Sequence, residues 1–182
     1  KMKNWIKKIF ELGVYYLLPD AFYDTYKSKN SNGVIRAINY HKINEDSYCN
    51  FVMQLEYFNR YYLNCNENDL ESVVTGCDRQ NRPRLIISFD DGDISNYYAA
   101  SFLEAYGFIG WFFIPTSCLK NSSIDSSDLL SLSKVQKFMT IDMIKDLILR
   151  GHVVGCHTST HRRLCDGLGQ EVYKKEIIGS YN

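Results

Sequence analysis

The sequence lacks a net charge, a long apolar run and any cysteine pair with C-x-x-C spacing. Lys plus Arg and Asp plus Glu both number 21, and this balance argues against a nucleic-acid partner. The uncharged run from Leu12 to Leu18 is too short to span a membrane. No small-residue cleavage site follows it, so we expect no signal peptide. Hydrophobic residues make up 45% of the 182 residues, which argues against disorder and predicts a globular domain.

The six cysteines do not form the dense framework of a small secreted domain. We expect them to be mostly reduced thiols in a reducing compartment, although their even number leaves disulfides in an exported protein open. Together with the missing signal peptide, this predicts a protein that is cytoplasmic or peripheral to the inner membrane.

The first 32 residues predict an amphipathic helix followed by a linker. One face of this helix carries four apolar residues, namely Trp5, Ile9, Leu12 and Tyr16. A helix docked on the domain is the favoured interpretation, and contact of residues 3–18 with a membrane surface is the alternative. The polar stretch 26–33 has the composition of a linker, so residues 1–32 and 33–182 are expected to be separate regions.

From residue 33 onward, short apolar strands alternate with amphipathic helices. We expect strands at 34–41, 85–89, 111–115 and 153–157, and helices at 51–63, 95–107, 141–150 and 170–182. A polar loop is expected at 121–133. This alternation is typical of βαβ units, and it predicts an α/β fold with a parallel sheet.

Polar side chains follow two of the predicted strands directly. Asp90 and Asp91 come after "LIISF", and His157 comes after "VVGC". The carboxyl ends of parallel strands meet at one edge of a sheet, where the reactive groups of such folds gather. His161 is four residues beyond His157, so both imidazoles can point the same way from a helical turn or a tight loop.

Two imidazoles and one carboxylate make a three-ligand site with open coordination positions, which suits Zn²⁺ or another divalent ion. A cation would also offset the repulsion between the adjacent Asp90 and Asp91. One of them could bind the metal while the other stays free as a base. Either cluster taken alone is also common on a solvated surface without a metal.

Other interpretations of these residues fit less well. A calcium loop that starts at Asp91 would need Gly and Glu where the chain has Asn96 and Phe102. Cys165 continues the series of His157 and His161, but a zinc-finger-like cluster would lack its fourth ligand. A non-haem iron site would use the same triad, with its carboxylate beside one histidine instead of far upstream.

The two remaining histidines are expected to have lesser roles. His152 follows a predicted helix, where a surface or helix-capping role is expected. His41 ends a strand on the face of the proposed site, so a substrate contact is a candidate role, although a structural hydrogen bond is favoured.

The motifs "SFDDG" and "HTSTH", with the segments between them, resemble the polysaccharide deacetylase family, also called the NodB homology domain. The resemblance covers residues 34–165. It implies a distorted (β/α) barrel and a metal-dependent hydrolase that removes acetyl groups, with N-acetyl favoured, from an acetylated oligo- or polysaccharide. The implied metal is zinc, with cobalt, nickel or iron as alternatives.

The resemblance also assigns roles to individual residues. It implies that Asp90 is the base and that Asp91, His157 and His161 are the metal ligands. Thr158 occupies a position that helps to shape the loop in the family. The implied chemistry agrees with the ligand set expected from the residues alone.

Three departures from the family pattern affect these expectations. Ser88 stands where the family usually has Thr, and Arg162 stands where it usually has Pro. The family's later motifs, which supply an arginine, an aromatic wall and a general acid histidine, are missing. Only about three βα units follow residue 84, whereas a complete barrel of this family usually takes about seven or eight. We therefore expect an incomplete barrel in a chain truncated at its C-terminus.

Two further hypotheses belong to other functional classes. The chain could be a non-catalytic carbohydrate-binding or scaffold protein that retains the deacetylase fold. A weaker alternative is an iron-dependent oxygenase that uses the same triad.

Overall fold

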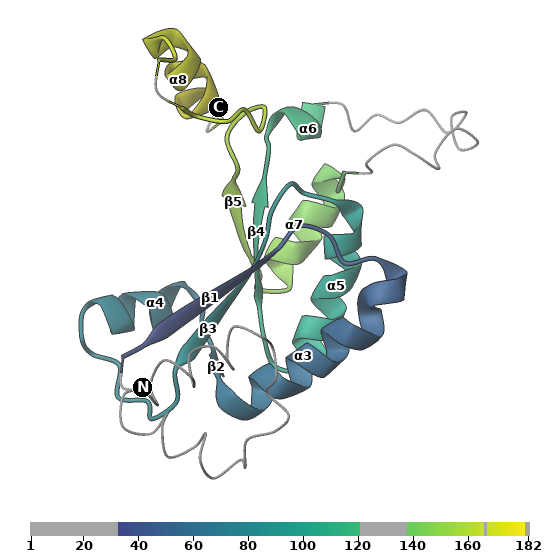
Figure 1. Cartoon of the computed structure of the whole chain (residues 1–182), viewed down its shortest axis with the longest axis vertical. Helices are drawn as coiled ribbons and strands as arrows, with labels where there is room; N and C mark the ends of the chain where they lie inside the picture. Colours follow the sequence, from purple (N-terminus) through teal and green to yellow (C-terminus); the bar gives the residue numbers. More distant parts are fainter. Residues whose placement is uncertain (1–32, 121–137, 166, 181–182) are drawn as a thin grey trace, which may run out of the picture.

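The computed structural model describes residues 33–120, 138–165 and 167–180 (Figure 1). The predicted N-terminal helix and linker, with the proposed membrane contact at residues 3–18, lie outside the described residues. The loop expected at 121–133 lies outside them as well.

Five parallel strands form one sheet. They are β1 (Ile35–Tyr40), β2 (Leu63–Asn64), β3 (Arg84–Phe89), β4 (Gly110–Ile114) and β5 (Val153–Cys156). Their order is β1-β3-β4-β5, and the short β2 pairs with the first residues of β3. In the described part of the chain β1 and β5 each pair with one strand, so the sheet is open. The predicted α/β fold with a parallel sheet is confirmed.

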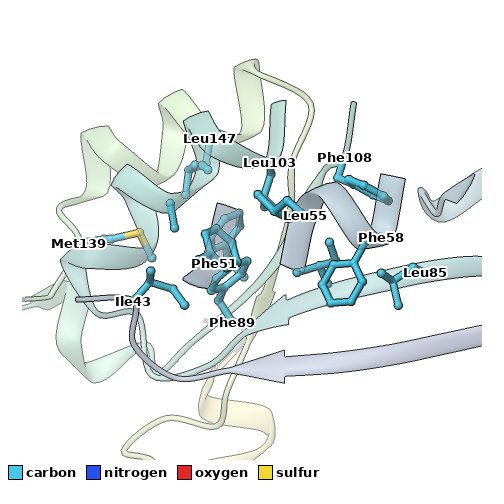
Figure 2. Packing of buried hydrophobic residues seen from close by; sticks show 14 of the residues in the cluster. Ile43, Phe51, Leu55, Phe58, Leu85, Phe89, Leu103, Phe108, Met139 and Leu147 are labelled. Carbon is cyan, nitrogen blue, oxygen red and sulfur yellow. The ribbon is translucent and has the colours of Figure 1, made fainter. Parts of the chain in front are cut away.

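Three helices cover one face of this sheet (Figure 1): α3 (Tyr48–Tyr61), α5 (Ile94–Ala105) and α7 (Ile141–Leu149). Alternate residues of β3 point toward them and are buried, namely Leu85, Ile87 and Phe89. They pack in one cluster with Phe51 and Leu55 of α3, Leu103 of α5 and Leu147 of α7 (Figure 2). The predicted strands and these three helices are thus confirmed, and their apolar spacing follows from this shared core.

Two elements near the start of β3 were not predicted. They are β2 and α4 (Glu67–Val74), which has no buried residue. A capping box holds the start of α4, because Asn66 and Asp69 exchange side-chain-to-backbone hydrogen bonds of 2.8 and 3.0 Å. Arg84 of β3 ties the strand to the helix through an ion pair of 2.9 Å with Asp69, and it makes a second ion pair of 2.9 Å with Asp78, which follows the helix. Polar contacts hold this helix, so no apolar spacing indicates it.

The helix expected at 170–182 is wrong in its length. The structure has α8 (Gln170–Glu176) and then a short 3-10 turn, η3 (Ile178–Ser180). The regular helix ends just before Ile177 and Ile178, which are both exposed, so no apolar contact supports further turns. In Figure 1, α8 lies beyond the carboxyl end of β5, away from α3, α5 and α7.

The surface role expected for His152 is wrong, whereas its backbone N–H does cap α7 by donating to the carbonyl of Leu147 at 3.0 Å. The side chain of His152 is fully buried at the end of α7. The Nδ1 atom accepts a hydrogen bond of 2.8 Å from the backbone N–H of Gly110, and Nε2 lies 2.9 Å from Oε1 of Glu104. His152 therefore satisfies a buried donor of β4 and links it to α5.

All six cysteines lie within the described residues, and no disulfide joins any two of them there. Across residues 33–120, 138–165 and 167–180, every helix is too short or too polar to cross a membrane.

Candidate metal centre and active site

The segment "DDGD" connects β3 to α5, and its three carboxylates have separate structural positions. Asp91 adopts a left-handed backbone conformation with φ 70°, which is uncommon for a residue with a side chain. Gly92 follows with φ 65°, and a Cβ atom there would lie 2.9 Å from Cγ2 of Ile114. Asp93 is the N-cap of α5 and accepts a hydrogen bond of 2.9 Å from Ser95 N–H. The turn therefore directs Asp90 and Asp91 to the edge of the sheet and leaves Asp93 to cap the helix.

The segment 157–161 leaves β5 as a tight loop. Its start continues the sheet, because the N–H of His157 donates to the carbonyl of Ile114 at 2.9 Å. Thr158 and His161 have left-handed backbones with φ 61° and 58°. The hydroxyl of Thr158 accepts a hydrogen bond of 3.0 Å from the N–H of His161 and closes the turn. Left-handed backbone at side-chain-bearing residues gathers at functional sites, and here three such residues flank one centre.

The two loops bring together the three residues predicted as metal ligands. The Nε2 atom of His161 lies 3.1 Å from Oδ1 of Asp91, and the Nε2 atom of His157 lies 3.6 Å from the same oxygen. The two imidazole rings are 4.7 Å apart between centroids. One ligand atom from each of the three residues lies within 4.8 Å of the others.

The chemistry of this cluster fits a divalent cation. Oδ1 of Asp91 is buried, and no donor reaches it with hydrogen-bond geometry although both imidazole nitrogens are close. A buried oxygen without a partner costs about 1–3 kcal/mol. A cation between this oxygen and the two nitrogens would satisfy it, and N₂O donor sets suit Zn²⁺ and related ions.

Asp90 lies beside this cluster without joining it. Its Oδ2 atom is 4.0 Å from Nε2 of His157 and accepts a hydrogen bond of 2.6 Å from Nδ2 of Asn39 on β1. The fully buried Asn96 holds the backbone beneath it, because its Nδ2 donates to the carbonyls of Asp90 at 3.3 Å and of His41 at 3.1 Å. The candidate base thus has a fixed position next to the candidate ligands.

Asn39 and Asn96 were missed in the sequence. Asn39 lies in β1 (IRAINY), where Arg36 is also polar, so its polarity alone does not distinguish it in the sequence. The buried position of Asn96 in the first turn of α5 has no distinctive sequence pattern. His41 is exposed, and its backbone carbonyl accepts the hydrogen bond from Asn96, so the structural hydrogen bond favoured for its side chain stays a prediction. A substrate contact by its side chain stays a prediction.

A pocket opens beside the cluster. Asp91 and His161 line it together with Thr160, Pro115, Cys118 and Phe138. Burial, with the nearby charge of Asp91, raises the pKa of the Cys118 thiol, so the thiol form is favoured at neutral pH. The lining of the pocket therefore combines two candidate metal ligands with largely uncharged groups.

An open parallel sheet with an Asp-His-His cluster at the carboxyl ends of its strands defines an α/β domain with a candidate metal site. Residues 78–181, more than half of the chain, match the sequence profile of polysaccharide deacetylases. The chain belongs to the polysaccharide deacetylase family. A search among curated proteins found no matching relative.

Several solved structures share this fold. IcaB from Ammonifex degensii is 17% identical with a TM-score of 0.63, and the match covers 82% of this chain and 67% of IcaB. The deacetylase PplD from Streptococcus pyogenes, in complex with acetate, is 16% identical with a TM-score of 0.59, over 81% of this chain and 64% of PplD.

A third similar structure is BC0361, a polysaccharide deacetylase from Bacillus cereus. It is 17% identical with a TM-score of 0.59, and the match covers 80% of this chain and 45% of BC0361. The chain therefore spans 45% to 67% of the length of these three proteins.

Proposed function

We propose that the chain is a metal-dependent hydrolase that removes acetyl groups from a carbohydrate polymer or its precursor. N-acetyl groups are the favoured target. The observation that carries this proposal is the convergence of Asp91, His157 and His161 on one point, with Asp90 beside them. This arrangement occurs in a chain of the polysaccharide deacetylase family. PplD was solved with acetate, the product that this reaction would release.

Asp91, His157 and His161 would hold the metal. We favour Zn²⁺ because it accepts mixed imidazole and carboxylate ligands with an open position, and Co²⁺, Ni²⁺ or Fe²⁺ are the alternatives. When bound, such an ion polarises a carbonyl oxygen and lowers the pKa of a water molecule.

Asp90 would act as the general base. Its carboxylate is held by Asn39 and would take a proton from the attacking water at Oδ1 or Oδ2. Pro115, Cys118 and Phe138, on the wall of the pocket, would receive the methyl group of the acetyl substituent. The polar Thr160 and His161 also line the pocket and would face the acetyl carbonyl.

The test compares two aspartate variants with a matched surface control. Asp91→Ala is expected to abolish metal retention, measured by elemental analysis after loading with Zn²⁺. Asp90→Ala is expected to keep the metal and lose acetate release from acetylated chitooligosaccharides. Asp142→Ala serves as the control, because that side chain is 94% exposed on α7.

The outcomes separate the candidate functions. Metal retention that is unchanged in Asp91→Ala would contradict the ligand assignment. A metal-loaded chain that binds the oligosaccharide without releasing acetate would favour the non-catalytic carbohydrate-binding or scaffold protein. An oxygen-dependent reaction of the iron-loaded chain would favour the oxygenase. The predicted cytoplasmic or membrane-peripheral location would be tested separately by cell fractionation.

A further inference from the structure

Glu176 is a buried charged residue on a helix that lies outside the hydrophobic core. Its side chain belongs to α8, and only 3% of the residue surface is exposed. No residue of α8 belongs to the core cluster defined by the described residues. A carboxylate is costly to bury unless polar partners satisfy it, so its contacts should indicate its role.

Both carboxylate oxygens of Glu176 accept hydrogen bonds from the loop that carries His157 and His161. The Oε2 atom accepts from the backbone N–H of Thr160 at 2.8 Å, and Oε1 accepts from the Thr160 hydroxyl at 2.7 Å. The backbone carbonyl of Glu176 accepts from the N–H of Ser159 at 2.9 Å. The hydrogen bonds from Thr160 lower the pKa of Glu176, so its carboxylate is ionised at neutral pH.

These contacts lie between the two strained positions of the loop. Thr158 and His161 have left-handed backbones, and residues with side chains keep this conformation only where their surroundings enforce it. The carboxylate of Glu176 accepts two hydrogen bonds from Thr160, the residue directly before His161. Two charge-assisted hydrogen bonds to one residue restrict both its backbone and its side chain.

The opposite side of the loop is fixed by the segment that leads into α6 (Ser117–Lys120). The N–H of Thr116 donates to the carbonyl of Thr158 at 3.2 Å, and the N–H of Ser117 donates to that of Ser159 at 2.8 Å. Elsewhere η3 is attached to β5, because the thiol of Cys156 donates to the carbonyl of Ser180 at 3.2 Å. The loop is therefore held between α6 and α8.

We propose that Glu176 is a positioning residue that fixes the conformation in which the loop presents His157 and His161. This inference rests on the proposed function in one respect, namely that these histidines bind a metal. It gives α8 a role that its lack of core contacts leaves otherwise unexplained.

The test uses Glu176→Gln in the full chain. Glutamine keeps the size of the side chain, but one of its two polar ends becomes an N–H₂ group that cannot accept from Thr160. The matched control is Glu171→Gln on the same helix, where the side chain is 87% exposed. A second variant, Thr160→Val, removes the hydroxyl donor and leaves Glu176 unchanged.

Two readouts are measured in each variant. Hydrogen exchange of the amides at 159–161 is followed in the metal-free protein, with the amides of β3 and β4 as a reference for global folding. The affinity for Co²⁺ is measured by its visible absorption. Glu176→Gln is expected to speed loop exchange at least about tenfold and to weaken Co²⁺ binding about tenfold, the lower end of losses seen when supporting contacts of a metal site are removed. Thr160→Val should change both in the same direction, and Glu171→Gln should change neither.

The outcomes distinguish this inference from the proposed function. Loop exchange equal to that of Glu171→Gln would overturn the role of Glu176, and so would faster exchange with unchanged Co²⁺ affinity. Co²⁺ binding that survives Asp91→Ala would overturn the proposed metal site instead. In that case the exchange measurement alone still decides whether Glu176 holds the loop.

Discussion

Asn39 donates a hydrogen bond from Nδ2 to Oδ2 of Asp90 at 2.6 Å, which joins β1 to the residue that directly follows β3. The parallel register explains this contact. Asn39 is paired with Ser88, and Asp90 is two residues further along the chain, on the same side of the sheet. This side is opposite to the core, since Leu85, Ile87 and Phe89 point toward the helices.

The first prediction concerns this hydrogen bond. Asn39→Ala is expected to lower the kcat for acetate release about tenfold, because Asp90 loses the donor that orients it, while Zn²⁺ affinity stays unchanged. Steady-state kinetics and elemental analysis would measure the two quantities. Asn50→Ala, at an exposed position of α3, is the control. A parallel loss of Zn²⁺ affinity and kcat would show that Asn39 supports the whole site and not the base alone.

A second prediction concerns the glycine between Asp91 and Asp93. Gly92→Ala should destabilise the fold by about 1–3 kcal/mol more than Gly107→Ala does. Both glycines have left-handed backbones, with φ 65° and 75°, so each substitution carries the same conformational cost. Only the new methyl group at Gly92 would meet another atom, Cγ2 of the buried Ile114 at 2.9 Å, whereas the space around Gly107 is open.

Urea unfolding of the two glycine variants would measure this difference. Gly92→Ala should also weaken metal binding, since a shift of this turn moves Asp91. Equal stability losses would mean that Ile114 relaxes without cost, and the close contact would then have no role in fixing the turn.

The third prediction tests the core beneath the site. Leu103 of α5 is fully buried against the sheet, and Leu103→Ala should cost about 2–5 kcal/mol of unfolding free energy. Leu149→Ala makes the same chemical change where the side chain is 86% exposed, and it should stay within about 0.5 kcal/mol of the parent chain. Thermal and urea denaturation of the pair would measure the contrast. A similar loss in both variants would contradict the position assigned to α5.

The fold was predictable where a local pattern of residue types, such as an apolar run or a helix cap, indicates a strand or a helix. Strand β3 was predicted from its short apolar run, and the start of α7 was predicted from Thr140, whose hydroxyl accepts from Met143 N–H at 3.3 Å. Helix α4 was missed because its stability comes from Asn66 and from ion pairs with Arg84. Contacts of that kind leave no periodic trace in the sequence.

In the candidate site, too, local sequence patterns indicate some residues, whereas others depend on contacts with distant parts of the chain. Asp91 and His157 follow apolar strands, so their meeting at one edge of the sheet could be expected from the pattern. Glu176 and Asn39 act through contacts with residues far away in the sequence, and their own neighbours give no sign of this. His152 was misplaced for a related reason, since its burial depends on the packing of α5 against β4.

The last prediction follows from the buried imidazole of His152. Burial lowers the pKa of His152, and the hydrogen bond to Glu104 only partly opposes this effect. The unfolded chain therefore binds a proton at a higher pH than the folded chain does, near the ordinary histidine value of about 6.5. The stabilisation is fully present above this pH and is lost as the pH falls toward the lower folded pKa, with a slope of at most about 1.4 kcal/mol per pH unit.

His152→Asn separates this titration from the hydrogen bond that His152 makes. The carbonyl oxygen of asparagine can accept from the N–H of Gly110 as Nδ1 does, but it does not titrate. Urea unfolding between pH 7.5 and about 5 should therefore show a flatter pH dependence in the variant than in the parent chain. Glu104, whose pKa is lowered by Arg150, loses its own contribution only below about pH 4.3, outside this window. Identical slopes in the two proteins would mean that other groups set the acid sensitivity, and the buried link between Gly110 and His152 would then not control it.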